Sequence, residues 1–164
     1  MEYKRLKKTG ILFLVAALIA AADHIFKLKA EKHPEEFREV VHNKGFAGER
    51  LSDKPETVRR VSLLVTLFNF ILLPFFPERT IEERMRKAGW LLMAGGGLSN
   101  TLDRVFRHYV VDYVRIGRYV YNLGDFSIAA GSALYITGCG MEIPKSGPHQ
   151  PPAAGEAFKE YGEF

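Results

Sequence analysis

Polar and charged side chains gather within one largely apolar stretch of the chain, residues 95–125. They are Asn100, Asp103, Arg104, Asp112, Asn122 and Asp125. Charged and amide side chains are expensive to bury or to expose to lipid, so these residues are candidates for a functional site. Asp112 and Asp125 lie on neighbouring predicted elements and could converge. Two close aspartates that share one proton can act as general acid and general base on a peptide bond.

Ordinary structural roles compete with catalysis at both aspartates. Residues 108–114 are predicted to form a short strand in which Asp112 lies between apolar neighbours. Because Asp is disfavoured at such a position, we expect Asp112 to have a partner or a task. Asn122 and Asp125 are three residues apart at the start of the last predicted helix and share a face. Asp is also a common cap at a helix start, so capping and catalysis both stay open for Asp125.

Two further pairs have the four-residue spacing that places side chains on one helix face. Asp23 and Lys27 form the first pair, and Asn100 and Arg104 form the second. The first pair is explained either as an ordinary ion pair at a membrane edge or as an anchor for an external element near the site. The guanidinium of Arg104 can bind a carboxylate or a backbone carbonyl, although a helix end that satisfies its own polar groups also explains this pair.

The bulk composition excludes several classes of protein. At 164 residues the chain is one domain, with 47% hydrophobic and 26% charged residues and a mean hydropathy of -0.08. The single cysteine, Cys139, excludes an internal disulfide framework. The formal charge of +4, without a basic tract interleaved with aromatics, argues against nucleic-acid binding. No HExxH motif is present and the histidines do not pair at ligand spacing, so we expect no metal or other cofactor.

Four apolar runs dominate the chain, at residues 10–22 with an interrupted continuation to 28, at 61–76, at 88–102 and at 119–141. A helix that crosses a bilayer needs about 20 mostly apolar residues. The fourth run has this length, and shorter runs can cross by thinning the bilayer and by extending flanking charges to its surface. We therefore predict an all-α membrane protein with four transmembrane helices in residues 1–141 and an external segment near 29–60. The tail at 142–164, rich in Pro, Gly and Glu, is predicted to be disordered and cytoplasmic.

Basic residues favour a cytoplasmic amino terminus and a cytoplasmic connection between the second and third runs. The first group is Lys4, Arg5, Lys7 and Lys8, and the second is Arg79, Arg84, Arg86 and Lys87. Both termini of a four-span protein would then be cytoplasmic. Four arginines on the predicted outer side weaken this signal, namely Arg104, Arg107, Arg115 and Arg118. Two other interpretations stay open: a secretory signal over residues 1–22, with Ala20–Ala22 as its cleavage site, and a soluble helical bundle.

Taken in order, the polar motifs resemble those of the signal peptidase II family, the lipoprotein signal peptidases. The family's Asp followed four residues later by Lys resembles Asp23–Lys27, and its Asn-x-Gly motif resembles Asn43–Gly45. Its glycine-rich run leading into Asn-x-x-Asp-Arg resembles Gly95–Arg104. Its Val-Val-Asp-Phe and Asn-x-Ala-Asp motifs resemble Val110–Tyr113 and Asn122–Asp125. Each motif alone is unspecific, whereas five in this order are specific.

This resemblance implies four transmembrane helices, a small external β-rich cradle and an aspartyl endopeptidase whose catalytic pair is Asp112 and Asp125. The implied supporting positions are Asp23, Lys27, Asn43, Gly45, Asn100, Arg104 and Asn122. The implied substrate is a prolipoprotein whose lipobox cysteine carries diacylglycerol, cut just before that cysteine. The implied setting is the bacterial cytoplasmic membrane, with a monomer surrounded by membrane lipids.

The chain departs from the family pattern at several positions. Gly124 replaces the usual Ala and Ser99 the usual Gly, both small-for-small exchanges that we expect to be tolerated. The first external motif lacks the usual Ala-Ala-Phe continuation, since Phe46 comes early. Two alternatives remain. One is a divergent paralogue that binds lipidated peptides without cutting them. The other is a small proton-coupled transporter with Asp125 as relay, although the sequence shows no internal repeat of the kind expected in such folds.

Overall fold

The computed structural model describes residues 2–46 and 50–141, so the predicted tail at 142–164 lies outside the described residues. Its long helices are α1 (Glu2–Lys32), α2 (Pro55–Leu72), α3 (Ile81–Phe106) and α4 (Leu123–Gly140). Short 3-10 turns follow α1 and α2, namely η1 (Pro34–Glu36) and η3 (Leu73–Phe75). The strands are β1 (Val41–Asn43), β2 (Val110–Asp112), β3 (Val114–Ile116) and β4 (Tyr119–Tyr121). The protein is therefore mostly helical, with two small antiparallel sheets.

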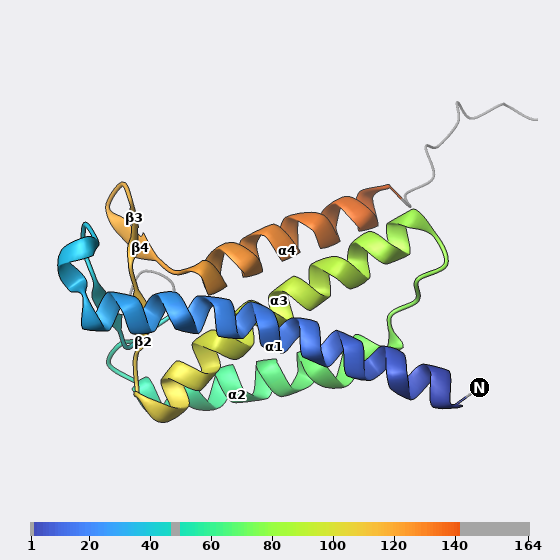
Figure 1. Ribbon diagram of the computed structural model, residues 1–164, viewed down its shortest axis with the longest axis horizontal. Helices are drawn as coiled ribbons and strands as arrows, with labels where there is room; N and C mark the ends of the chain where they lie inside the picture. The colour runs from blue at the N-terminus through green and yellow to red at the C-terminus, as the bar shows by residue number, and fades with distance from the viewer. Residues whose placement is uncertain (1, 47–49, 142–164) are drawn as a thin grey trace, which may run out of the picture.

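The four helices run along one long axis, with their connections at alternate ends (Figure 1). The start of α1, the connection from α2 to α3 and the end of α4 lie at one end of the molecule. Both sheets lie at the opposite end, where α1 and α3 finish and α4 begins. The segments that carry the polar motifs therefore meet at the sheet end.

The two sheets place the end of β2 beside the start of α4. In the first sheet β1 pairs antiparallel with β2, and Val41 lies opposite Asp112. In the second sheet β3 and β4 form a hairpin whose two-residue turn has Gly117 at a φ of +61°, a conformation that favours glycine. A backbone hydrogen bond of 2.8 Å from Tyr113 N to Tyr121 O then draws the residue after β2 toward the last residue of β4, two positions before α4 begins.

Glycines bring the backbones of α3 and α4 into direct contact, and these two helices share the most extensive interface in the fold. A Cβ atom on Gly89 would lie 2.5 Å from the carbonyl oxygen of Gly131. A Cβ atom on Gly96 would overlap the carbonyl oxygen of Gly124. Small residues permit such close helix packing inside a membrane, and here the second contact lies within the first turn of α4.

Polar and apolar side chains are distributed in the reverse of the arrangement expected for a water-soluble bundle. Large apolar side chains such as Leu18, Leu64 and Leu67 point outward from α1 and α2, whereas Asp23 and Lys27 are fully buried. Within the described residues, two helical segments are long and apolar enough to cross a membrane, Lys8–Lys32 and Pro55–Phe75. An apolar exterior around a polar interior favours lipid rather than water around the helices.

Several element boundaries differ from the sequence-based expectation. The fourth apolar run does not begin as a helix, because Tyr119–Tyr121 forms β4 and α4 starts at Leu123. Of the strand expected at 108–114, Val110–Asp112 forms β2 and Val114 begins β3, whereas His108 has a φ of +67°, which lies outside the strand range. Of the basic residues assigned to the second connection, Arg79 alone precedes α3, since the helix starts at Ile81 and includes the other three.

Candidate active site

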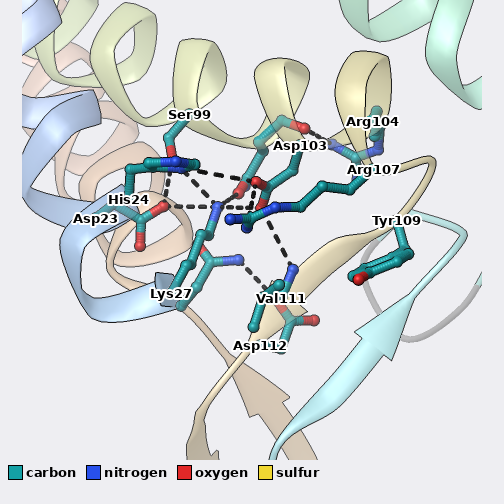
Figure 2. Close-up of polar contacts among 12 residues, drawn as sticks. Asp23, His24, Lys27, Ser99, Asp103, Arg104, Arg107, Tyr109, Val111 and Asp112 are labelled. Atoms are coloured by element: carbon teal, nitrogen blue, oxygen red, sulfur yellow. Dashed lines mark hydrogen bonds and ion pairs between the residues drawn. The ribbon is translucent and has the colours of Figure 1, made fainter. Parts of the chain in front are cut away.

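A fully buried lysine forms the centre of the polar interior. Lys27 of α1 places its Nζ 2.7 Å from an oxygen of Asp23 and 2.9 Å from an oxygen of Asp103. It also donates to Asn100 Oδ1 at 2.8 Å and to Ser99 Oγ at 3.2 Å. Figure 2 shows these contacts converging on the lysine from α1 and α3. One ammonium thus forms ion pairs with two buried carboxylates and links α1 to α3.

Asp103 extends this cluster to the strand that carries Asp112. Its Oδ2 accepts a hydrogen bond of 3.3 Å from the backbone N of Val111, and its Oδ1 lies 3.0 Å from Arg107 (Figure 2). The sequence-based list of supporting positions did not include Asp103. It lies within the Asn-x-x-Asp-Arg motif, three residues after Asn100, and this shared helix face was the available signal.

The two candidate catalytic aspartates meet at one asparagine. Asn122 donates from its Nδ2 to Asp112 Oδ1 at 2.6 Å, and from its backbone N to Asp125 Oδ2 at 3.2 Å. Each carboxylate has one further amide donor. Asn43 Nδ2 lies 3.2 Å from Asp112 Oδ2, and Asn100 Nδ2 lies 2.9 Å from Asp125 Oδ1. The site therefore presents two carboxylates, each held by two N–H groups.

Asp125 caps α4 and also accepts a hydrogen bond from Asn100 of α3. The side chain of Asn122 accepts from Asp125 N at 2.9 Å while Asp125 accepts from Asn122 N, which is a complete capping box. The two roles left open for Asp125 are therefore compatible, since one carboxylate oxygen closes the helix start and the other faces Asn100. The cap fixes the side chain of Asp125 in one orientation.

The environment of Asp112 favours its protonated form. Burial raises the pKa of this carboxyl most, the nearby charge of Asp125 also raises it, and the net pKa is about 6. The amide donors Asn43 and Asn122, together with the charge of Lys27, oppose this rise. A carboxyl with a pKa near 6 can exchange a proton close to neutral pH, as general acid and base chemistry requires.

Arg104 fixes the external segment that reaches Asp112. Its guanidinium donates to the carbonyl of Gly45 at 2.9 Å and to the carbonyl of Asn100 at 3.2 Å. It also lies over the ring of Phe46, 5.4 Å from the centroid. Within the segment, Gly45 N donates to Asn43 Oδ1 at 2.9 Å, which turns the other end of that amide toward Asp112.

All nine residues predicted from the sequence lie in this one hydrogen-bonded assembly. The contacts run from Asp23 and Lys27 through Asn100 to Asp125, then through Asn122 to Asp112, and return through Asn43, Gly45 and Arg104. The sequence did not single out the hydroxyls of Ser99 and Tyr113, both of which bind Asp23. Across residues 2–46 and 50–141, no group of three metal-ligating side chains is present.

Apolar outer faces around a pair of carboxylates, one buried and one partly buried, are the features of a helical membrane hydrolase. The family model described as signal peptidase (SPase) II matches residues 15–139. Lipoprotein signal peptidases of Aquifex aeolicus and Histophilus somni are 34% and 30% identical, over 80% and 79% of this chain and 87% and 88% of theirs. The chain belongs to the signal peptidase II family.

Two solved structures share the fold of this chain. A bacterial membrane enzyme superposes with a TM-score of 0.67 at 20% identity, covering 87% of this chain and 94% of its own. A second bacterial membrane enzyme gives a TM-score of 0.59 at 22% identity, covering 79% of this chain and 92% of its own. At these identities the likeness concerns the fold alone.

Proposed function

We propose that this protein is an aspartyl endopeptidase that removes the signal peptide of diacylglyceryl-modified prolipoproteins, cutting just before the lipidated cysteine. The observation that carries the proposal is the pair Asp112, which is buried, and Asp125, which is partly buried, joined through Asn122. Their arrangement fits a family whose relatives are named lipoprotein signal peptidases. We propose no metal or other cofactor for the reaction.

In the proposed reaction, the two aspartates share one proton and titrate as a coupled unit. The ionised member removes a proton from a water molecule as the water oxygen attacks the scissile carbonyl carbon. The protonated member donates a hydrogen bond to the carbonyl oxygen and then protonates the leaving amine as the C–N bond breaks. Asn43, Asn100 and Asn122 keep both carboxylates in position, which makes the site preorganised before substrate arrives.

The proposed membrane placement has four spanning helices within a single domain, residues 1–141. Helix α1 and the α2 segment pass the length and apolarity test for a span, and α3 and α4 run beside them along the same axis. The end that holds the amino terminus and the end of α4 is cytoplasmic in this placement, and the sheet end is external. The protein is then a monomer in the bacterial cytoplasmic membrane, since all nine site residues come from one chain. Lipid surrounds its apolar faces, and the dyad lies where water and an anchored lipopeptide both have access.

The binding-only alternative receives little support from the site. A protein that only holds a lipidated peptide gains nothing from joining a buried and a partly buried carboxylate through one asparagine, because a charge removed from water is destabilising. Proton relay by Asp125 alone leaves the contact of Asp112 with Asn122 without a purpose.

The deciding experiment is cleavage of a diacylglyceryl-modified prolipoprotein by the purified protein in detergent. Wild type is compared with Asp112→Asn and Asp125→Asn, and the same prolipoprotein without the lipid serves as substrate control. We expect cleavage before the lipidated cysteine by wild type and at least a 1000-fold lower rate in each variant, on the order of what catalytic groups contribute. Binding of the lipidated substrate without cleavage by folded wild type would establish the binding-only alternative instead.

A further inference from the structure

Two hydroxyl groups, those of Ser99 and Tyr113, bind the same buried carboxylate. Ser99 Oγ donates to Asp23 Oδ2 at 2.6 Å, and Tyr113 Oη donates to Asp23 Oδ1 at 3.0 Å. Each oxygen of Asp23 thus accepts a hydrogen bond from one hydroxyl, and Oδ2 also contacts the ammonium of Lys27.

The Tyr113 hydroxyl has a second partner at the start of α4. It accepts a hydrogen bond of 3.1 Å from the backbone N of Leu123, the first residue of that helix. The first N–H groups of a helix have no partner within the helix, so they bind a side chain or water instead. Tyr113 supplies the side-chain acceptor, while Asn122 caps the N–H of Asp125.

The ring of Tyr113 is held firmly enough for its hydroxyl to act as a fixed link. It is buried, stacks with Phe26 at a centroid distance of 6.1 Å and meets the edge of Phe37 at 5.7 Å. Burial, together with the charge of Asp23, raises the pKa of the Tyr113 hydroxyl, so this group stays protonated and donates to Asp23.

We infer that Tyr113 is a positioning residue for the aspartate pair, because its hydroxyl joins Asp23 of α1 to the first N–H of α4 and so fixes the turn that carries Asn122 and Asp125. The inference rests on the proposed peptidase function. The hydroxyl of Tyr113 bonds to Asp23 and to the backbone of Leu123, so it acts on the aspartate pair through the backbone at the start of α4. Loss of the hydroxyl leaves Asp23 Oδ1 without its donor and Leu123 N without its acceptor.

The test is steady-state cleavage of the lipidated prolipoprotein by wild type and Tyr113→Phe, with Tyr109→Phe as matched control. Tyr109 lies four residues earlier and donates its hydroxyl to Glu31 at 3.0 Å, away from the pair. For Tyr113→Phe we expect a fall in kcat of about tenfold with KM within about twofold, since one buried hydrogen-bonded link is lost and substrate binding is not. For Tyr109→Phe we expect both constants to match wild type.

A second variant cuts the same link from its other side. Leu123→Pro removes the N–H that binds Tyr113, and proline is well tolerated at the first position of a helix. The preceding residue, Asn122, already has the extended φ of -127° and ψ of 173° that proline requires of its neighbour. We expect Leu123→Pro to lower kcat to a similar extent, and the double variant to fall no further than either single one.

The outcomes separate the inference from the proposed function. The inference fails if Tyr113→Phe has the kcat of wild type, or if its only change is in KM. It also fails if Tyr109→Phe loses as much kcat as Tyr113→Phe, or if the losses in kcat of Tyr113→Phe and Leu123→Pro add in the double variant. If wild type cleaves and Leu123→Pro is fully active, the inference also fails while the peptidase function stands. If wild type fails to cleave, both fail together.

Discussion

Replacement of Lys27 tests whether one ammonium holds the interior of this protein together. Lys27→Met keeps a long side chain but removes the charge that lies 2.7 Å from Asp23 and 2.9 Å from Asp103. Two buried carboxylates are then left without their cation. Removing one partner of a buried ion pair costs about 3–5 kcal/mol, against total stabilities of about 5–15 kcal/mol. We therefore expect Lys27→Met to lower the free energy of unfolding by about 3–5 kcal/mol.

The matched control is Lys29→Met, two residues further along the same helix. Lys29 pairs with Glu36 at 2.5 Å, but both side chains are about half exposed. Exposed ion pairs contribute about 0–1 kcal/mol, so this variant should unfold close to wild type. The assay is denaturant or thermal unfolding of purified protein in detergent micelles at pH 7. Equal destabilisation by the two variants would refute the reasoning, because burial would then make no difference.

A rescue variant sharpens the same test. Lys27→Met combined with Asp103→Asn leaves one buried carboxylate in place of two, so the double variant should be more stable than the sum of the single changes predicts. The Asn side chain can still accept from Val111 N, as Asp103 does at 3.3 Å. Strict additivity of the two changes in unfolding free energy would show that Lys27 and Asp103 do not interact in the folded protein.

Two further predictions concern the carboxylate pair and the helix contact. In the folded protein the pKa of Asp112 is raised from 3.8 to about 6. The folded protein is therefore stabilised by protonated Asp112, and this contribution to the free energy of unfolding is fully present below pH 3.8 and is lost as the pH rises through about 6. The melting temperature of Asp112→Asn relative to wild type should therefore be higher at pH 8 than at pH 5, and a constant difference would contradict the raised pKa. Gly96→Ala should lower stability by about 1–3 kcal/mol, because its Cβ would overlap the carbonyl oxygen of Gly124. Gly97→Ala is the control, since its Cβ would meet its nearest neighbour, Thr66 Oγ1, at 3.8 Å; equal effects in a thermal melt would contradict the close contact.

The positions of the site residues could be predicted from the sequence because their types conflict with their surroundings. Asp112 and Asp125 in apolar segments, and the four-residue spacing of Asp23 and Lys27, need no structure to be noticed. The partners could not be predicted in the same way. Tyr113 meets Asp23 across 90 positions of sequence, and spacing carries no information about such a contact.

The fold was predictable to the extent that hydropathy determines it. Apolar runs locate the helices, but they do not distinguish a strand from a helix. The sequence therefore did not reveal that Tyr119–Tyr121 forms β4. Helix ends extend further than the runs because charged residues are good helix formers, as at the start of α3 from Ile81. The β1–β2 pairing joins segments about 70 residues apart, which local patterns do not reveal.

The buried cluster around Lys27 has a consequence for how the chain is inserted during synthesis. Helix α1 emerges first with Asp23 and Lys27 on one face, and until α3 arrives these two side chains have only each other. The remaining partners, Ser99, Asn100 and Asp103, follow more than 70 residues later. A buried ion pair that lacks its further hydrogen-bond partners is costly in lipid. We therefore expect this end of the first helix to stay near the bilayer surface until the third helix joins it.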